Sequence, residues 1–562
     1  MTSPTKQLAL MLLGGLVALA ASGCYVDAYP VLVKDGVADD GGDDDSGTGE
    51  GSDDDGHDES GWEPETGSPL LDMPEGDPLP SGDCRPDARS LDAPLPCGLA
   101  PPTSTLEPTV AWQWFGHDDE TSVLVTPLVA NLTDDDLSGS VDLCDRPDVV
   151  AIAVDLPDSP NMELPSGHIY LLDGTSGEVH VRFDRPVDAT ITPVIADLDG
   201  DDVPEIIATE RRSDDSDSHR VIAFRASGEV LWVSNYWSTT TGGLAVVDLD
   251  QDGSPELIAP DHVLRATGEL AWAPADLPSS PSLPVPADLD LDGDLELIFG
   301  RSIYDHEGVL VETLDVPGPH NVAVAAVANF DADPEPEIFI QSQQLRLFDH
   351  DGANLMTCGG GAKAGPSVIA DIDGDGQLEV ITQRNNKLRA IRIGESCSPL
   401  VELDLDFDQT ASATSFNLDA YGAPETITVA NDRVSIRDSA WIELAGLPHQ
   451  VNPASLATPV VVDADNDGAA EILLAGSAPS PDPQRHGQEV ATLQLVQNAD
   501  DRFAPTRRIW NQHAYYVTNI NEDGHVPAVQ EAHWLSDTNS FRTNRERSYD
   551  EDQCQPPEPV LP

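Results

Sequence analysis

Basic residues are scarce in this chain of 562 residues. Lys and Arg together number 28 against 101 Asp and Glu, which gives a formal net charge of −73. The phosphates of DNA and RNA would repel such a protein, so nucleic acid is excluded as a natural partner. Catalytic signatures are missing as well, because the chain has no Gly-x-Ser-x-Gly, no His-Glu-x-x-His and no phosphate-binding glycine-rich loop. We therefore expect no enzyme activity.

One short sequence motif recurs eight times along the chain. It consists of an apolar run, a loop with carboxylates at alternate positions and a second apolar run, and its clearest copy extends from Pro366 to Thr382. The loops of the copies begin at residues 131, 197, 248, 288, 329, 371, 417 and 463, so six of the seven spacings lie between 40 and 51 residues. A period in the forties indicates a repeat architecture.

Each repeat contains four short blocks of β-forming residues, for example 192–196, 205–209, 220–224 and 229–233. Gly, Asp, Asn or Pro separates the blocks, and no run of twelve residues within a repeat has a helical period. Four short antiparallel strands at this spacing predict an all-β fold in which each repeat is one blade of a β-propeller. Eight loops favour eight blades, and seven is the alternative if a degenerate copy forms no blade.

The spacing of the carboxylates predicts that these loops bind a metal ion. Side chains at loop positions one, three and five can point inward together, position seven can add its backbone carbonyl, and the carboxylate at position nine can close the far side. Such an all-oxygen cage suits Ca²⁺ rather than Zn²⁺. The loop is not an EF-hand, because Thr382 stands at position twelve of the clearest copy and strands flank it. The alternative is that Asp and Gly merely favour turns, but five loops carry carboxylates at the same four positions.

The motif, its spacing and the strands predicted on either side of it resemble the FG-GAP/VCBS repeats, whose β-propellers include the integrin α-subunit head. In that family, side chains at loop positions one, three, five and nine and a backbone oxygen at position seven bind Ca²⁺. The resemblance covers roughly residues 110–500 and implies five sites with a full carboxylate set: Asp197, Asp199, Asp201 and Glu205; Asp248, Asp250, Asp252 and Glu256; Asp288, Asp290, Asp292 and Glu296; Asp371, Asp373, Asp375 and Glu379; and Asp463, Asp465, Asp467 and Glu471.

The three other loops depart from this pattern. Asn329, Asp331, Asp333 and Glu337 imply a sixth site, with a neutral first ligand and with Pro334 where Gly is usual. In the loop from Asn417, Tyr421 replaces the ligand at position five, and we expect no tight site. The loop from Asn131 contains an insertion that puts its ninth position out of register, so its ligand set stays open.

The amino terminus predicts export. Residues 1–23 contain one Lys, an apolar stretch of about a dozen residues and then Ala21, Ser22 and Gly23 before Cys24, as in a secretory signal that is too short to span a membrane. This end resembles a bacterial lipobox, which implies a lipid anchor on Cys24 at the outer membrane or cell surface of a Gram-negative-type bacterium. Tyr25, in place of Asp, argues against retention at an inner membrane. The alternative is an ordinary cleaved signal with a free Cys24.

Residues 24–83 are rich in Asp, Gly and Ser, and a Cys- and Pro-rich linker follows at 84–108. A segment of low hydrophobicity and dense negative charge cannot bury enough apolar surface to fold, so residues 24–83 predict a disordered tether. Six cysteines remain after Cys24, which suggests three disulfides with fifteen connectivities. The pairs close in sequence are Cys84–Cys97 and Cys358–Cys397, which would leave Cys144 with Cys554.

The ends of the repeat array suggest how a propeller at 109–505 closes. Val110–Phe115 is similar to the outer strands of other blades, and we expect it to complete the last blade. Residues 506–562 are dense in aromatic and amide side chains, although aromatics make up only 5% of the chain. This segment either packs on or extends the propeller with its aromatics in the core, or presents them as a sugar-binding face.

Two function classes follow. The favoured one is a surface-anchored, Ca²⁺-binding module for adhesion to an extracellular protein or glycan, attached to the membrane only through its lipid. The alternative is a carbohydrate-active enzyme, because some polysaccharide lyases resemble an eight-bladed propeller with similar Ca²⁺ loops. Such a lyase needs a basic cluster to neutralise a uronate, and after the signal only Lys34, Lys363 and Lys387 are lysines. The sequence does not name the ligand.

Overall fold

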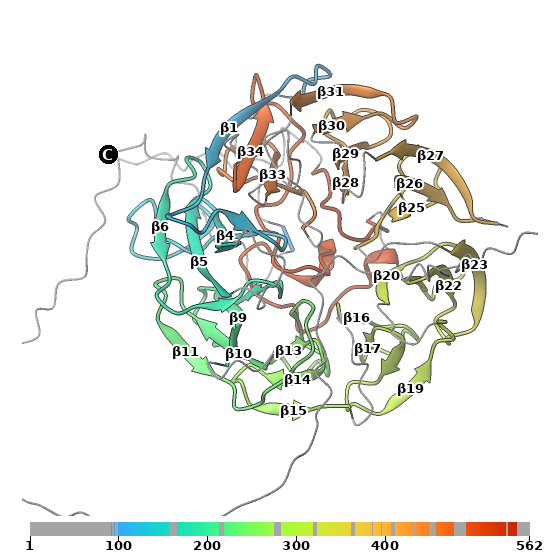
Figure 1. The fold of residues 1–562 in the computed structure, drawn as a ribbon, viewed down its shortest axis with the longest axis horizontal. Helices are drawn as coiled ribbons and strands as arrows, with labels where there is room; N and C mark the ends of the chain where they lie inside the picture. Colours follow the sequence, from blue (N-terminus) through green and yellow to red (C-terminus); the bar gives the residue numbers. More distant parts are fainter. Residues whose placement is uncertain are drawn as a thin grey trace, which may run out of the picture.

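A computed structural model describes residues 91–92, 95, 99, 101–156, 166–212, 218–274, 283–317, 323–360, 366–384, 386–394, 396–405, 411–430, 433–448, 457–476, 491–535 and 538–547. The predictions for the signal, Cys24, the acidic tether, Cys84, Cys97 and Cys554 fall outside these residues. The described chain forms eight antiparallel sheets arranged around a centre (Figure 1). The prediction of an all-β propeller with eight blades is confirmed.

The first four blades follow one another in chain order. Blade 1 has six strands, β2 (Ser122–Val123), β3 (Leu128–Ala130), β4 (Asp148–Val154), β5 (Ser166–Asp173), β6 (Val179–Arg182) and β7 (Val187–Asp188); blade 2 has β8 (Val194–Ala196), β9 (Glu205–Arg211), β10 (His219–Phe224) and β11 (Val230–Val233); blade 3 has β12 (Ala245–Val247), β13 (Glu256–Ala259), β14 (His262–Arg265) and β15 (Leu270–Trp272); blade 4 has β16 (Val285–Ala287), β17 (Glu296–Phe299), β18 (Ser302–Tyr304) and β19 (Leu310–Thr313).

The other four blades complete the ring. Blade 5 has β20 (Val324–Ala328), β21 (Glu337–Gln341), β22 (Gln344–Phe348) and β23 (Asn354–Gly360); blade 6 has β24 (Val368–Ala370), β25 (Glu379–Arg384), β26 (Lys387–Arg392) and β27 (Ser398–Asp404); blade 7 has β28 (Ser412–Phe416), β29 (Glu425–Ala430), β30 (Arg433–Arg437) and β31 (Glu443–Pro448); blade 8 has β32 (Val460–Val462), β33 (Glu471–Ala475), β34 (Leu493–Asn498) and β1 (Pro108–Trp114). Two short 3-10 helices, η1 (Val517–Asn519) and η2 (His533–Leu535), follow the last strand. Neither these nor any other helix among the described residues is long and apolar enough to cross a membrane.

Within the blades, burial decreases from the innermost strand, at the centre of the ring, to the outermost strand. The inner strand β8 is buried throughout, whereas the outer strand β19 is exposed throughout. Apolar side chains on both faces of the inner strands pack against the neighbouring blades, and they form the cores between blades. The short apolar blocks of the sequence therefore became strands because both of their faces can be covered.

The ring closes through its two ends. The first strand of the chain, β1, pairs antiparallel with β34 from Pro108 opposite Asn498 to Trp114 opposite Leu493 (Figure 1). The predicted completion of the last blade by Val110–Phe115 is thus confirmed. A disulfide between Cys358 of β23 and Cys397, just before β27, joins blades 5 and 6 as predicted. Cys144 is disulfide-bonded as well.

The carboxy-terminal segment fills the centre of the propeller. Residues 503–535 and 538–547, which we call the central plug, wind through the middle of the ring (Figure 1). The plug is hydrogen-bonded to the innermost strand of every blade: Trp510 to Val129, Asn511 to Ile195, Gln512 to Val246, Tyr516 to Pro286, His533 to Val327, Phe541 to Ile369, Arg542 to Thr414 and Asn544 to Val461. Each innermost strand is the edge of its sheet. In seven blades the bond engages a backbone group of that strand, and in blade 7 it engages the side-chain hydroxyl of Thr414.

Aromatic and charged side chains of the plug are buried. Trp510 is fully buried and stacks on Tyr515 with 4.3 Å between ring centroids, so these rings belong to the core and not to a sugar-binding face. Arg542 is also buried and donates to the carbonyl oxygens of His513, Ser367 and Ala325. Burial would raise the pKa of the Glu522 carboxyl, but the charges of its arginine neighbours, Arg508 foremost, lower it to about 2. The plug is therefore held as a part of the folded core.

We expect loss of the Trp510 ring to weaken the whole propeller. Trp510→Ala should lower the free energy of unfolding by about 3–5 kcal/mol, the usual cost of removing a buried Trp side chain. Denaturant titration followed by circular dichroism measures this change. The control is Val529→Ala in the same segment, where the side chain is 67% exposed and the change should stay within about 0.5 kcal/mol. Equal effects of the two substitutions would mean that the plug is not part of the core.

Candidate metal-binding loops and the adjoining pocket

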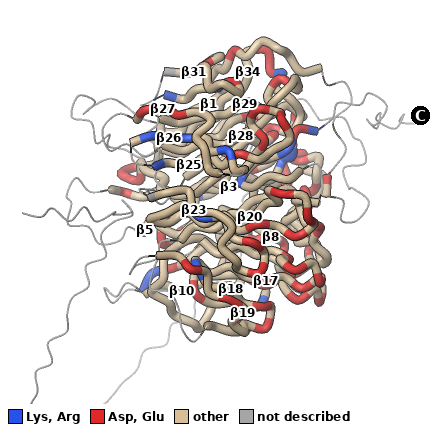
Figure 2. Tube along the Cα trace, turned by 90° about the vertical axis from the view of Figure 1, so that its right-hand side faces the viewer, with Lys and Arg blue, Asp and Glu red and all other residues tan. Residues whose placement is uncertain are grey.

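The acidic loops lie on one face of the disc. In each blade the loop joins the innermost strand to the second strand, for example β12 to β13 and β16 to β17. Seen from the side, Asp and Glu gather along this face (Figure 2). The periodic sequence therefore places the predicted ligand sets at equivalent points around the ring.

The carboxylate at position nine turns back onto the start of its own loop. One oxygen accepts a hydrogen bond from the backbone N–H of position two, at 3.0 Å from Leu198 to Glu205 and at 2.8 Å from Ala464 to Glu471. The same bond recurs at Glu256, Glu296, Glu337, Glu379 and Glu425. Because the backbone occupies one oxygen, the second oxygen of each Glu is left for another partner.

The first carboxylate of the loop also folds the backbone around itself. Asp248 accepts the N–H groups of Asp252 at 3.1 Å and Gly253 at 2.8 Å. Positions four and six adopt positive φ, 54° at Gln251 and 89° at Gly253, which explains why glycine is frequent at position six. Proline cannot adopt this φ, so Pro334 makes the loop from Asn329 depart from the others at that position.

The structure identifies the ninth position of the first loop, which sequence reasoning left open. Asp148, the first residue of β4, accepts a hydrogen bond from the N–H of Leu132 at 3.0 Å. This is the bond that Glu makes in the other seven loops, so the insertion lies between Asn131 and Asp148. The signal in the sequence was the apolar run Val149–Val154 directly after Asp148, which matches the run after each Glu.

The loop of blade 8 is the best protected ligand set. Asp463 and Glu471 are each 1% exposed, and Asp463 Oδ1 and Glu471 Oε1 have no hydrogen-bond partner among the described residues. Burial, followed by the charges of the other carboxylates in the loop, raises the pKa of both groups well above the ordinary range. Burial likewise raises the pKa of Asp465 to about 6. Carboxylate oxygens without partners are costly to bury, and a hard cation would compensate them, so this loop fits Ca²⁺.

The loops of blades 3 and 4 fit a cation as well. Asp248, Asp250 and Asp252 bring one carboxylate oxygen each within 4.8 Å of the others. Asp288 Oδ1 is buried without a hydrogen-bond partner among the described residues. Burial, and then the neighbouring aspartates, raises the pKa of Glu256 to about 7 and that of Glu296 to about 8. These sets are all-oxygen and more open than the set of blade 8.

An arginine side chain enters two of the predicted ligand sets. Arg392 ends β26 opposite Glu379, and its guanidinium contacts Asp373, Asp375 at 3.0 Å and Glu379 at 2.9 Å. In blade 2, Arg225 follows β10 and lies 2.9 Å from both Asp199 and Asp201 and 3.7 Å from Glu205.

In both loops, therefore, the guanidinium meets positions three, five and nine. Because it neutralises carboxylates that a cation would otherwise bind, it competes with Ca²⁺, and Ca²⁺ binding there stays a prediction. The sequence places both arginines just before a turn, and only the pairing of the strands shows which loop each one reaches.

The loops that begin with Asn329 and Asn417 each use the amide nitrogen of that Asn as a hydrogen-bond donor within the protein. Asn329 donates to the backbone carbonyl of Asp333 at 2.6 Å, which turns its nitrogen into the loop. Asn417 donates to Glu546 of the plug at 2.7 Å, and Tyr421 is 79% exposed. The sequence predicted no tight site in the second of these loops, and its Asn417 side chain is engaged with the plug.

A pocket of about 810 Å³ adjoins the loops of blades 2 and 3. His525 of the plug stands at its edge, with Nε2 3.1 Å from Asp197 and 3.4 Å from Asp202. The interaction of the ring with the Asp523 carboxylate, and then the charges of the surrounding carboxylates, raise the pKa of this imidazole above the ordinary range. Charged and polar lining residues come from blades 1 to 3 and the plug: Asn131, Asp142, Asp197, Asp199, Asp202, Asp252, Ser254, Glu256, Arg265, Thr267, Asp523 and His525.

No protein-family model and no curated protein matches the sequence. Among solved structures, the V. cholerae biofilm matrix protein Bap1 is similar at 16% identity and a TM-score of 0.64, over 79% of this chain and 99% of that chain. Rhamnogalacturonan lyase YesW has 14% identity and a TM-score of 0.45, over 70% and 75% of the two chains. The Bacillus licheniformis rhamnogalacturonan lyase PL11 has 17% identity and a TM-score of 0.43, over 71% and 75%. At these identities the likeness shows the propeller fold alone.

We expect Ca²⁺ to stabilise the folded protein through the loops of blades 3, 4 and 8. A ligand that binds only the folded state stabilises it by about 1.4 kcal/mol per site when its free concentration is ten times Kd. Differential scanning calorimetry should therefore show a higher melting temperature in millimolar Ca²⁺ than in chelator, with Mg²⁺ as the control cation. Identical melting in Ca²⁺ and in chelator would contradict the metal assignment.

We expect that removing the guanidinium from the loop of blade 6 creates a Ca²⁺-binding site there. Arg392→Gln should raise the number of Ca²⁺ ions bound per chain by one, measured by elemental analysis after dialysis against Ca²⁺. In chelator the same variant should lose about 1 kcal/mol of stability, the upper range for a partly exposed ion pair. Arg433→Gln is the matched control, because Arg433 pairs with Glu443 on the outer strands of blade 7. Unchanged Ca²⁺ content in folded Arg392→Gln would refute the competition.

Proposed function

We propose that this protein is an exported, Ca²⁺-dependent binding module that holds its ligand in the pocket beside the loops of blades 2 and 3. The observation that carries the proposal is the pocket itself. Its volume, about 810 Å³, lies within the range of small-molecule and glycan sites. Three blades and the plug form its walls, so the pocket is present only in the closed ring.

The lining favours a ligand rich in hydroxyl groups. The carboxylates of Asp199, Asp202 and Asp252 would repel a polyanion, while Arg265 supplies a single guanidinium in the lining. Hydroxyl groups can donate to these carboxylates, and they can also complete the coordination of a hard cation held by the loop of blade 3. A glycan therefore fits this pocket better than an acidic peptide does.

The alternative function, a polysaccharide lyase, would require different side chains in the pocket. Cleavage of a uronate polymer requires basic groups that neutralise the carboxylate and accept a proton. In this pocket Arg265 and His525 are the basic side chains of the lining, and His525 is already engaged by Asp197, Asp202 and Asp523. This arrangement supports binding without catalysis, and an assay for unsaturated uronate products tests the alternative directly.

We further propose that the module is tethered to the outer membrane or cell surface through a lipid on Cys24. The basis is the lipobox-like sequence that ends at Cys24 and the acidic segment after it. The disulfides of Cys144 and of Cys358 with Cys397 agree with export to an oxidising compartment. Mass spectrometry of the mature amino terminus tests the anchor, and an unmodified Cys24 would rule it out.

We expect one carboxylate of the pocket to be required for ligand binding. A glycan array probed in Ca²⁺ should give hits that disappear in chelator, and Asp252→Asn should weaken the best hit by about tenfold or more, or 1.4 kcal/mol. Asp292→Asn is the matched control, because it changes the same loop position in blade 4, outside the pocket. Equal losses in both variants, or hits that ignore Ca²⁺, would contradict this site.

A further inference from the structure

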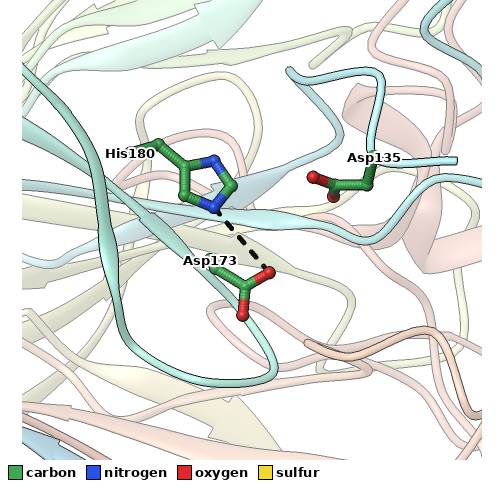
Figure 3. Close-up of side chains that lie close together, drawn as sticks. All are labelled: Asp135, Asp173 and His180. Atoms are coloured by element: carbon green, nitrogen blue, oxygen red, sulfur yellow. Dashed lines mark ion pairs between the residues drawn. The ribbon is translucent and has the colours of Figure 1, made fainter. Parts of the chain in front are cut away.

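Three side chains from separate elements converge in blade 1. Asp135 comes from the long first loop, Asp173 ends β5, and His180 lies on β6 (Figure 3). Each offers a ligand atom, and these atoms all lie within 4.8 Å of one another. The group differs from the predicted Ca²⁺ sets because one of its members is an imidazole.

His180 stands at a position where the other blades carry apolar residues. On β6, Val181 pairs with Leu171 and Val179 pairs with Leu172, so His180 is the extra residue of a β-bulge. The outermost strand of every blade has the same bulge. Its extra residue elsewhere is Leu231, Ala271, Val311, Leu355, Leu400, Leu444 or Ala111. A bulge re-aims a side chain, and only in blade 1 is that side chain of a type that can bind a metal.

The second carboxylate beside His180 orients the ring. Asp148 accepts hydrogen bonds from the N–H of Leu132 and from the hydroxyl of Thr133, at 3.0 and 3.1 Å, and its Oδ1 lies 3.4 Å from Nδ1 of His180. Nε2 of the ring then faces Asp173, whose Oδ2 is 3.8 Å away (Figure 3). A carboxylate behind one ring nitrogen and a free second nitrogen is the usual arrangement of a metal-binding histidine.

Burial leaves the facing atoms without ordinary partners. The side chains of His180 and Asp173 are 6% and 4% exposed. Asp135 Oδ2, Asp173 Oδ2 and His180 Nε2 are buried, and among the described residues none of them has a hydrogen-bond partner. Buried polar atoms normally have such partners, and exceptions require an explanation. The 3.8 Å separation of Nε2 and Oδ2 is too long for a hydrogen bond and leaves room for a bridging ion.

We infer that Asp135, Asp173 and His180 form a binding site for a divalent transition metal such as Zn²⁺. An imidazole together with carboxylates suits Zn²⁺ and its neighbours in the series, whereas Ca²⁺ takes oxygen ligands. Three protein ligands leave one position of a tetrahedral ion for water or for a group of a bound partner. Asp148 serves as the positioning residue for His180. This site is independent of the proposed glycan pocket.

The test is Zn²⁺ binding to the full chain in excess Ca²⁺, which keeps Zn²⁺ out of the all-oxygen loops. Elemental analysis after dialysis should give one Zn²⁺ fewer per chain for His180→Leu than for the wild type. A difference is measured because the cluster of Asp197, Asp202 and His525 can take Zn²⁺ as well. Co²⁺ in place of Zn²⁺ should give visible absorption bands of a tetrahedral site that His180→Leu removes.

Two controls keep the test decisive. His180→Leu introduces the residue that other blades carry at this bulge, so it should fold, and circular dichroism checks this. Should it not fold, Asp135→Asn on the loop replaces it, with the same expected loss of one Zn²⁺. His350→Gln, a partly exposed histidine paired with Asp349, should leave the Zn²⁺ content unchanged. Equal Zn²⁺ content in the wild type and the folded variants would overturn the inference and leave His180 as an ordinary ion-pair partner of Asp173.

Discussion

The hydrogen bonds between the central plug and the eight innermost strands are the constraint on which the rest of the structure depends. A propeller blade ends at the centre in a sheet edge, with backbone N–H and C=O groups that face the channel. Here one segment near the carboxy terminus pairs with all of these edges, from Val129 of blade 1 to Val461 of blade 8. Folding of the plug is therefore coupled to closure of the whole ring.

The plug also forms one wall of the proposed ligand pocket. His525 and Asp523 extend from it to the loop of blade 2, where they meet Asp197 and Asp202. Buried Glu522 nearby is held by Arg508 at 3.0 Å. Since these contacts fix where the plug leaves the channel, the same segment that satisfies the sheet edges also positions one wall of the pocket.

Repulsion between carboxylates is the second theme of the fold, and the blades resolve it in different ways. Blades 2 and 6 bring in Arg225 and Arg392, and blade 1 brings in His180. Blade 7 has a neutral Asn417 that is turned toward the plug. Blade 8 buries Asp463 and Glu471 near Arg508, with one oxygen of each unpartnered among the described residues. A single loop sequence thus supports several electrostatic solutions, because different side chains of neighbouring strands and of the plug reach the loops.

Much of the fold could be predicted from the sequence, and so could the positions of the acidic loops. The spacing of about forty residues, the four apolar blocks per repeat and the similarity of Val110–Phe115 to other outer strands led to an eight-bladed ring closed by β1 and β34. These features are local, because alternating apolar residues and turn residues specify strands and hairpins within one repeat. The carboxylates at positions one, three, five and nine likewise follow directly from the chain.

What the tertiary structure alone decided is which groups face those carboxylates. Arg392 is thirteen residues from Glu379 in sequence, yet strand pairing places the two side chains 2.9 Å apart. Asp148 takes the ninth position of a loop that begins at Asn131, because β4 resumes the repeat only after the insertion. The aromatic tail was ambiguous in sequence, since burial in a channel and display on a surface call for the same residue types. By itself the sequence determined the blades and their acidic loops. Strand pairing within a blade decided which loops an arginine or a histidine enters, and the path of the plug decided which loops it contacts, because those contacts join residues that no local pattern relates.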